Sequence, residues 1–122
     1  GKYLPGQPAP AGSRATDEKG GANMISRFMT DEVLTRVQKL RPIADDLGIT
    51  MAQLAVAWVL ANDNVAGAII GASRPEQVVD NARAVDVTLD AATLAAIDEA
   101  LGDAVQADPS LTQANAPAVR PA

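Results

Sequence analysis

The sequence predicts an α/β fold that is mostly helical and contains one clear, buried strand. Four segments carry helix start signals, and they begin near residues 30, 50, 74 and 90. The apolar run Val65–Ile70 is bounded by turn residues and lacks polar alternation. Such a run is typical of a parallel strand that is covered on both faces. The length of 122 residues allows one ordinary domain.

The N-terminal part of the chain is expected to be irregular up to residue 23, because glycine and proline recur there without an apolar period. The first helix should begin after Thr30, whose hydroxyl can accept a hydrogen bond from the first turn. Pro42 should break this helix near Arg41, since proline removes an amide donor. Gly48 suits the left-handed conformation that ends a helix.

The second helix should begin at Thr50, because Thr50 and Gln53 have the spacing of a capping box, and it should run to about Ala61. It is apolar on nearly every side, so other protein is expected to cover it. The following strand, Val65–Ile70, needs neighbouring strands for its backbone donors and acceptors. The chain contains no second convincing strand, which indicates that the sequence is part of a larger structure.

The third helix is expected over about residues 75–84, because Ser73 and Glu76 have the spacing of a second capping box and Pro75 lies in the first turn. Asp90 is expected to cap a fourth helix, which Gly102 should end. Residues 103–122 are dominated by Ala, Pro, Gln and Asp, a composition that predicts a disordered tail.

The composition excludes several classes of function. The net charge of −5 argues against a nucleic-acid partner, which requires a basic surface. The chain has no Cys and no His, so it cannot build disulfides, zinc or haem sites on those ligands, or a Ser–His nucleophile system, and no metal site is predicted. No apolar run reaches the roughly 18 residues of a membrane span, and no signal peptide opens the chain. We expect a cytoplasmic protein without a membrane partner.

The stretch from Gly71 to Asn81 carries the most specific chemical signal. Free amides at a helix N-terminus bind anions, and Gly71 permits close backbone approach. Arg74 opposes the helix dipole, a penalty that a bound phosphate would reverse. Three polar residues that could hydrogen-bond a base or ribose follow at helical spacing: Gln77, Asp80 and Asn81. The alternative is that Ser73 is only a helix cap and Arg74 only a solvated surface residue.

Residues 69–81 resemble the segment of the aldo-keto reductases that follows the last barrel strand and holds the adenosine 2′-phosphate of NADPH. Residues 52–60 resemble the preceding helix of that family. Residues 1–3 and 13–15 resemble its cofactor-covering loop. The resemblance is strongest to the bacterial branch that is similar to potassium-channel β subunits and includes the glyceraldehyde-phosphate reductases, and it covers roughly residues 1–101 in the right order.

The resemblance implies a (β/α)₈ TIM barrel of which this chain is a C-terminal fragment. Residues 1–102 would be the C-terminal part of the reductase domain, and residues 1–23 would form the cofactor-covering loop. Eight residues would bind NADPH: Lys2 and Arg14 at its phosphates, Gly71, Ser73 and Arg74 around the 2′-phosphate, and Gln77, Asp80 and Asn81 at the adenine end. The family commonly has Glu where Asp80 stands, so that contact would be made by a shorter side chain.

The resemblance assigns no catalytic residue to this chain. The family's catalytic Asp, Tyr, Lys and His lie upstream of the matching segment, and Lys2 and Tyr3 belong to a different motif. Three functions remain open at this point. The chain could be the NADPH-binding portion of a reductase that acts on aldehydes or ketones, and would then be inactive alone. It could instead be a non-catalytic nucleotide-binding or regulatory module, or a small helical scaffold with a vestigial ligand loop.

Overall fold

The computed structural model describes residues 2–105 and residue 110 of the chain. Within residues 2–105, ten helical segments follow one another, and none of these residues forms a strand. The segments are η1 (Arg14–Thr16), α1 (Gly21–Ile25), η2 (Ser26–Phe28), α2 (Asp31–Gln38), α3 (Arg41–Asp46), α4 (Met51–Leu60), α5 (Pro75–Ala82), η3 (Arg83–Asp86), α6 (Ala91–Leu101) and η4 (Gly102–Ala104).

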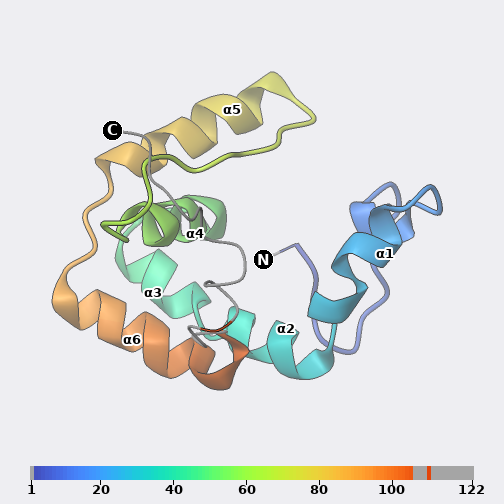
Figure 1. The fold of residues 1–122 in the computed structure, drawn as a ribbon, viewed down its shortest axis with the longest axis horizontal. Helices are drawn as coiled ribbons and strands as arrows, with labels where there is room; N and C mark the ends of the chain where they lie inside the picture. The colour runs from blue at the N-terminus through green and yellow to red at the C-terminus, as the bar shows by residue number, and fades with distance from the viewer. Residues whose placement is uncertain (1, 106–109, 111–122) are drawn as a thin grey trace.

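The N-terminal helices lie apart from α5. In Figure 1, α1 lies at the right of the view and α5 lies above α4 at the upper left. The expected irregular segment over residues 1–23 is interrupted by η1 and by the start of α1. Its two arms are tied together by the Tyr3 hydroxyl, which accepts a hydrogen bond from the Ala15 amide at 3.3 Å.

The predicted break in the first long helix is confirmed. Thr30 caps α2 by accepting a hydrogen bond from the Val33 amide at 3.3 Å, and Pro42 lies in the first turn of α3. Two residues separate α2 from α3, because proline cannot donate to the preceding turn. Gly48 ends α3 with a φ of +65°, as its sequence position predicts.

A small core lies where α3, α4 and α6 meet. It consists of four buried residues: Ala44, Leu54, Ile97 and Leu101. Trp58 is half-buried and packs against this cluster, as expected for an aromatic residue on the predicted apolar helix. Only one side of α4 is covered, however, and Val59 on the other side of the helix is 40% exposed.

The prediction of a buried strand over Val65–Ile70 is wrong. This stretch is an irregular connection between α4 and α5, and the Ile69 side chain is fully exposed. Figure 1 shows it as a loop without a neighbouring strand. The physical reason is that a strand exists only when other strands pair with its backbone, and no described segment offers that pairing.

The helices near the C-terminus follow their predicted signals closely. The third predicted helix is α5, which ends at Ala82 and continues as η3. The Asp90 carboxylate caps α6 by accepting from the Thr93 amide at 2.7 Å, and this hydrogen bond lowers the pKa of Asp90. Gly102 ends α6 with a φ of +47°.

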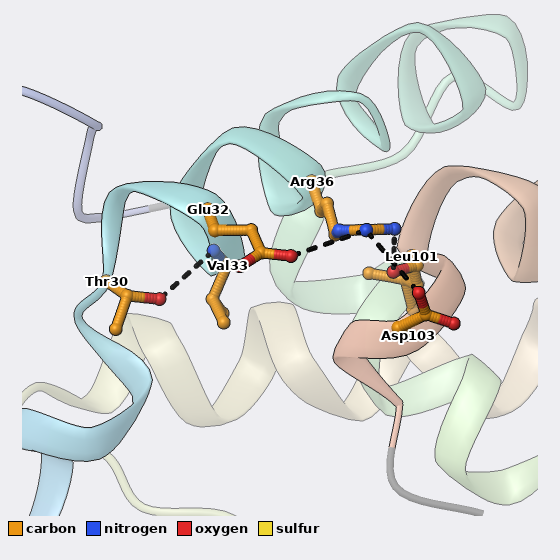
Figure 2. A network of polar contacts seen from close by, with 6 residues as sticks. All are labelled: Thr30, Glu32, Val33, Arg36, Leu101 and Asp103. Atoms are coloured by element: carbon orange, nitrogen blue, oxygen red, sulfur yellow. Dashed lines mark hydrogen bonds and ion pairs between the residues drawn. The ribbon is translucent and has the colours of Figure 1, made fainter.

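Arg36 holds the C-terminal end of α6 against α2. Its Nη1 donates to the Leu101 carbonyl at 3.1 Å, and its Nη2 lies 3.4 Å from a Glu32 carboxylate oxygen and 4.0 Å from an Asp103 oxygen (Figure 2). A guanidinium thereby satisfies a carbonyl at the negative end of the helix dipole. Of the predicted tail over residues 103–122, residues 106–109 and 111–122 lie outside the described residues.

Taken singly, no helix in the described part of the chain is both long and apolar enough to cross a membrane. The segments Asp31–Asp46 and Met51–Leu60 meet the length and composition criteria only as a pair, and they are bent by 94° relative to each other.

Candidate functional site

The start of α5 differs from the predicted capping box. The N-cap residue is Arg74, with extended backbone angles of φ −143° and ψ 145°, and Pro75 is the first helical residue. The predicted role of Ser73 as the cap is therefore wrong. A proline at the first helical position fixes the cap one residue earlier, at Arg74, and brings Gln77 rather than Glu76 to the third helical position.

Three donors converge on one oxygen at this helix start. Gln77 Oε1 accepts hydrogen bonds from the Ser73 amide at 2.8 Å, the Ser73 hydroxyl at 3.2 Å and the Arg74 amide at 3.3 Å. Such a group of backbone and hydroxyl donors at the positive end of a helix is suited to an anionic oxygen. Here the side-chain carbonyl of Gln77 accepts from all three donors.

The surroundings of these donors are open. Gly71, Ser73 and Arg74 are exposed, and a Cβ built on Gly71 would meet no atom within 4 Å. The Arg74 guanidinium forms no ion pair with any residue that the structure describes. A positive charge beside three convergent donors is therefore available to a ligand that approaches from solvent.

The predicted residues Arg74, Gln77 and Asp80 line one open surface hollow of about 520 Å³. Glu76, Val79 and Arg83 complete its lining. Arg83 was not among the predicted site residues. It follows Asp80 by three positions, a helical spacing that could have indicated a second cation on this face.

Asp80 is held from the first turn of α4. Gln53 Nε2 donates to Asp80 Oδ1 at 2.9 Å and to the Asp80 carbonyl oxygen at 3.0 Å, and the Thr50 hydroxyl donates to Asp80 Oδ2 at 3.4 Å. The capping box that the sequence predicts for α4 is present, with Thr50 Oγ1 accepting from the Gln53 amide at 3.2 Å. Its further contact with Asp80 was not predicted.

The other predicted site residues lie outside the hollow. Lys2 lines a second hollow, together with Ile49, Thr50 and several residues of α3 and α4. Arg14 belongs to η1, which contacts α1, and Figure 1 shows α1 apart from α5. Asn81 is half-buried and does not line the hollow beside Arg74. The structure thus brings together Ser73, Arg74, Gln77 and Asp80, and it does not bring Arg14 to them.

The described residues contain no cluster of three or more His, Cys, Asp or Glu side chains that could hold a metal ion. The only ligands from which such a cluster could be built are carboxylates, because the sequence has neither His nor Cys.

Comparison with known proteins yields matches over most of the chain. A sequence model of the Aldo/keto reductase family matches residues 2–101. A probable voltage-gated potassium channel subunit beta of Arabidopsis thaliana is 47% identical over 87 residues, which are 71% of this chain and 26% of that protein. A protein of the same description from Oryza sativa subsp. japonica is 44% identical over 87 residues. L-glyceraldehyde 3-phosphate reductase of Escherichia coli strain K12 is 34% identical over 104 residues, or 84% of this chain and 30% of that enzyme. The chain thus spans between a quarter and a third of the length of these relatives.

Proposed function

The chain belongs to the Aldo/keto reductase family, and from that membership we propose that it is the NADPH-binding portion of a reductase that acts on aldehydes or ketones. The observation that supports this proposal best is the convergence of the Ser73 amide, the Ser73 hydroxyl and the Arg74 amide on one oxygen. The name of the Escherichia coli relative describes a reductase of a phosphorylated aldehyde, which supports a carbonyl compound as substrate.

In this proposal the 2′-phosphate of NADPH binds at the start of α5. One phosphate oxygen takes the place of Gln77 Oε1 and accepts from the donors of Ser73 and Arg74. The Arg74 guanidinium neutralises part of the phosphate charge, since charge-assisted hydrogen bonds to phosphate are among the stronger ones. Gly71 leaves room for the approach of the ligand, because no atom lies within 4 Å of the position of a Cβ on it.

Release of Gln77 from these donors frees its amide for the nucleoside. Gln77 and Asp80 line the same hollow as Arg74, so both can meet the adenine end of a ligand whose phosphate lies at the helix start. Asn81 remains a predicted contact at that end. Lys2 and Arg14 remain predicted contacts of the cofactor phosphates, carried by residues 1–23 as a cofactor-covering segment.

When bound, NADPH supplies the hydride that reduces a carbonyl carbon. The residues described above would bind and orient its adenosine end, and none of them takes part in the hydride or proton transfer. Residues 1–102 would accordingly be the C-terminal, cofactor-binding part of the reductase domain. We expect the 122-residue chain alone to reduce no carbonyl compound, which a sensitive assay of NADPH oxidation with an aldehyde can test.

Calorimetric titration of the chain with NADPH and NADH tests the binding proposal. We expect tighter binding of NADPH, and we expect the combined variant Ser73→Ala and Arg74→Ala to abolish that preference. Arg27→Ala is the matched control, because Arg27 is an exposed arginine that stacks on Phe28 in η2. A preference for NADPH that survives the double variant, or is lost equally in the control, would contradict the proposal.

A further inference from the structure

Gln53 is a buried amide whose hydrogen bonds join two helices. It is 6% exposed, although glutamine is mostly an exposed residue. Its Oε1 accepts from the Thr50 amide at 3.0 Å, and its Nε2 donates to the carbonyl oxygen and to Oδ1 of Asp80, at 3.0 and 2.9 Å. Both polar atoms of the Gln53 side chain therefore form hydrogen bonds, the oxygen with the N-cap of α4 and the nitrogen with α5.

The nitrogen of Gln53 is not needed for capping. A capping box requires only that the residue at the third helical position accept a hydrogen bond, and Glu and Gln serve equally. Here a Glu would place a second carboxylate within hydrogen-bond distance of Asp80, whereas Gln supplies a donor. The choice of Gln at this position is thus explained by Asp80 rather than by the cap.

The Asp80 carboxylate is held in one orientation by these contacts. Oδ1 receives the Gln53 donor at 2.9 Å, whereas Oδ2 receives only the Thr50 hydroxyl at 3.4 Å. Because a carboxylate offers about four lone-pair sites, Oδ2 retains accepting capacity. Asp80 also lines the hollow that Arg74 and Gln77 share, so its carboxylate lies at the nucleoside end of the proposed site.

We propose that Gln53 is a positioning residue that orients the Asp80 side chain and thereby sets the preference of the site for a base with an exocyclic amine. This inference rests on the proposed function of the hollow as a nucleotide site. A carboxylate oxygen accepts from the 6-amino group of adenine and repels the 6-oxo group of hypoxanthine, which presents a lone pair instead of a donor. Gln53 does not touch the ligand, so its influence passes through Asp80.

Exchanging amide and carboxylate between the two positions tests this role. In Asp80→Asn alone, the Gln53 donor should draw the oxygen of the new amide toward itself and leave its nitrogen facing the hollow. In Asp80→Asn combined with Gln53→Glu, the carboxylate at position 53 loses the hydrogen bond to the main-chain carbonyl of residue 80, but it should attract the nitrogen of the new amide and leave the oxygen facing the hollow. The same asparagine should therefore show two base preferences, decided by the residue at position 53.

The measurement is the ratio of the affinities of adenosine 2′,5′-bisphosphate and inosine 2′,5′-bisphosphate for the full chain, by calorimetry. We expect the natural chain to favour the adenosine compound about tenfold, as one charge-assisted hydrogen bond allows. Asp80→Asn should lose or invert this ratio, and the double variant should restore most of it. Thr30→Ala is the control, since it removes the equivalent cap of α2 and should leave the ratio unchanged.

Two outcomes bear on the role of Gln53, and a third bears on the proposed function. Equal ratios in Asp80→Asn and in the double variant would overturn the role of Gln53 while leaving the nucleotide site in place. A ratio that falls in Thr30→Ala as well would show that a general loss of helix stability is sufficient, and would also overturn it. Failure of the natural chain to bind either compound would overturn the proposed function, and the positioning role would fall with it.

Discussion

Removing the Gln77 amide should strengthen the binding of a simple phosphate at the start of α5. Gln77 Oε1 holds three donors at 2.8, 3.2 and 3.3 Å, and a phosphate must displace it from all of them. Hydrogen bonds on an exposed side chain are worth about 0.5 kcal/mol each, so the displacement costs about 1.5 kcal/mol in total. Gln77→Ala should therefore bind methyl phosphate about tenfold more tightly than the natural chain.

Titrations of the amide chemical shifts by NMR at low salt can measure these weak affinities. Gln77→Glu should have the opposite effect, because its carboxylate would occupy the donors more strongly and repel the phosphate. Gln38→Ala is the matched control, since the Gln38 amide donates to the Tyr3 carbonyl and lies on α2. Unchanged or weaker phosphate binding in Gln77→Ala would refute the idea that Gln77 occupies an anion site.

Three further predictions concern the fold that carries this site. Leu54→Ala should lower the free energy of unfolding by about 2–5 kcal/mol, because Leu54 is 2% exposed. Val59→Ala on the same helix should lower it by less than about 1 kcal/mol, since Val59 is 40% exposed. Urea titration of the two variants measures this difference. Gly102→Ala should lower the free energy of unfolding by about 1–3 kcal/mol, because Gly102 has a φ of +47° and an added Cβ would meet the Arg36 guanidinium. Thermal unfolding of Gly102→Ala, Arg36→Ala and the double variant measures the coupling between the two positions. The Asp90 carboxylate should stabilise the fold at a pH above its ordinary pKa, and this contribution should be lost as the pH falls through its lowered pKa in the folded state. Asp90→Asn should therefore make the free energy of unfolding depend less on pH in the acid range. An unchanged pH dependence would contradict this prediction.

Signals that act within one helical turn were readable in the sequence. Thr30, Thr50 and Asp90 cap their helices as predicted, and Gly48 and Gly102 end theirs with positive φ. Each of these interactions joins residues no more than a few positions apart, so the local spacing of residues in the sequence is enough to predict it. The family resemblance was likewise carried by contiguous motifs, and it is confirmed over residues 2–101.

The first residue of α5 is Pro75, as the sequence predicts, but the N-cap is Arg74 and not the predicted Ser73, although the necessary signal was present. Ser73 and Glu76 matched one capping pattern, while Arg74 and Gln77 matched the same spacing one position later. Pro75 decides between them, because proline strongly prefers the first helical position. Giving that preference more weight than the identity of the cap would have led to the observed arrangement.

Interactions between distant segments could not be read from the pattern. The hydrogen bonds from Gln53 to Asp80 join residues 27 positions apart, and only the packing of α5 on α4 brings them together. The apolar run Val65–Ile70 has the composition of a strand, but strand formation depends on partners rather than on composition. The sequence pattern therefore predicted the helices well and the tertiary polar contacts poorly.

The most direct test of the central claim is to map the binding of adenosine 2′,5′-bisphosphate on the chain by NMR and to compare it with adenosine 5′-monophosphate. We expect the 2′-phosphate to strengthen binding, and we expect the additional shift changes to be largest at the amides of Ser73 and Arg74. Equal affinity for the two compounds, or additional shifts confined to residues outside the α5 start, would contradict it.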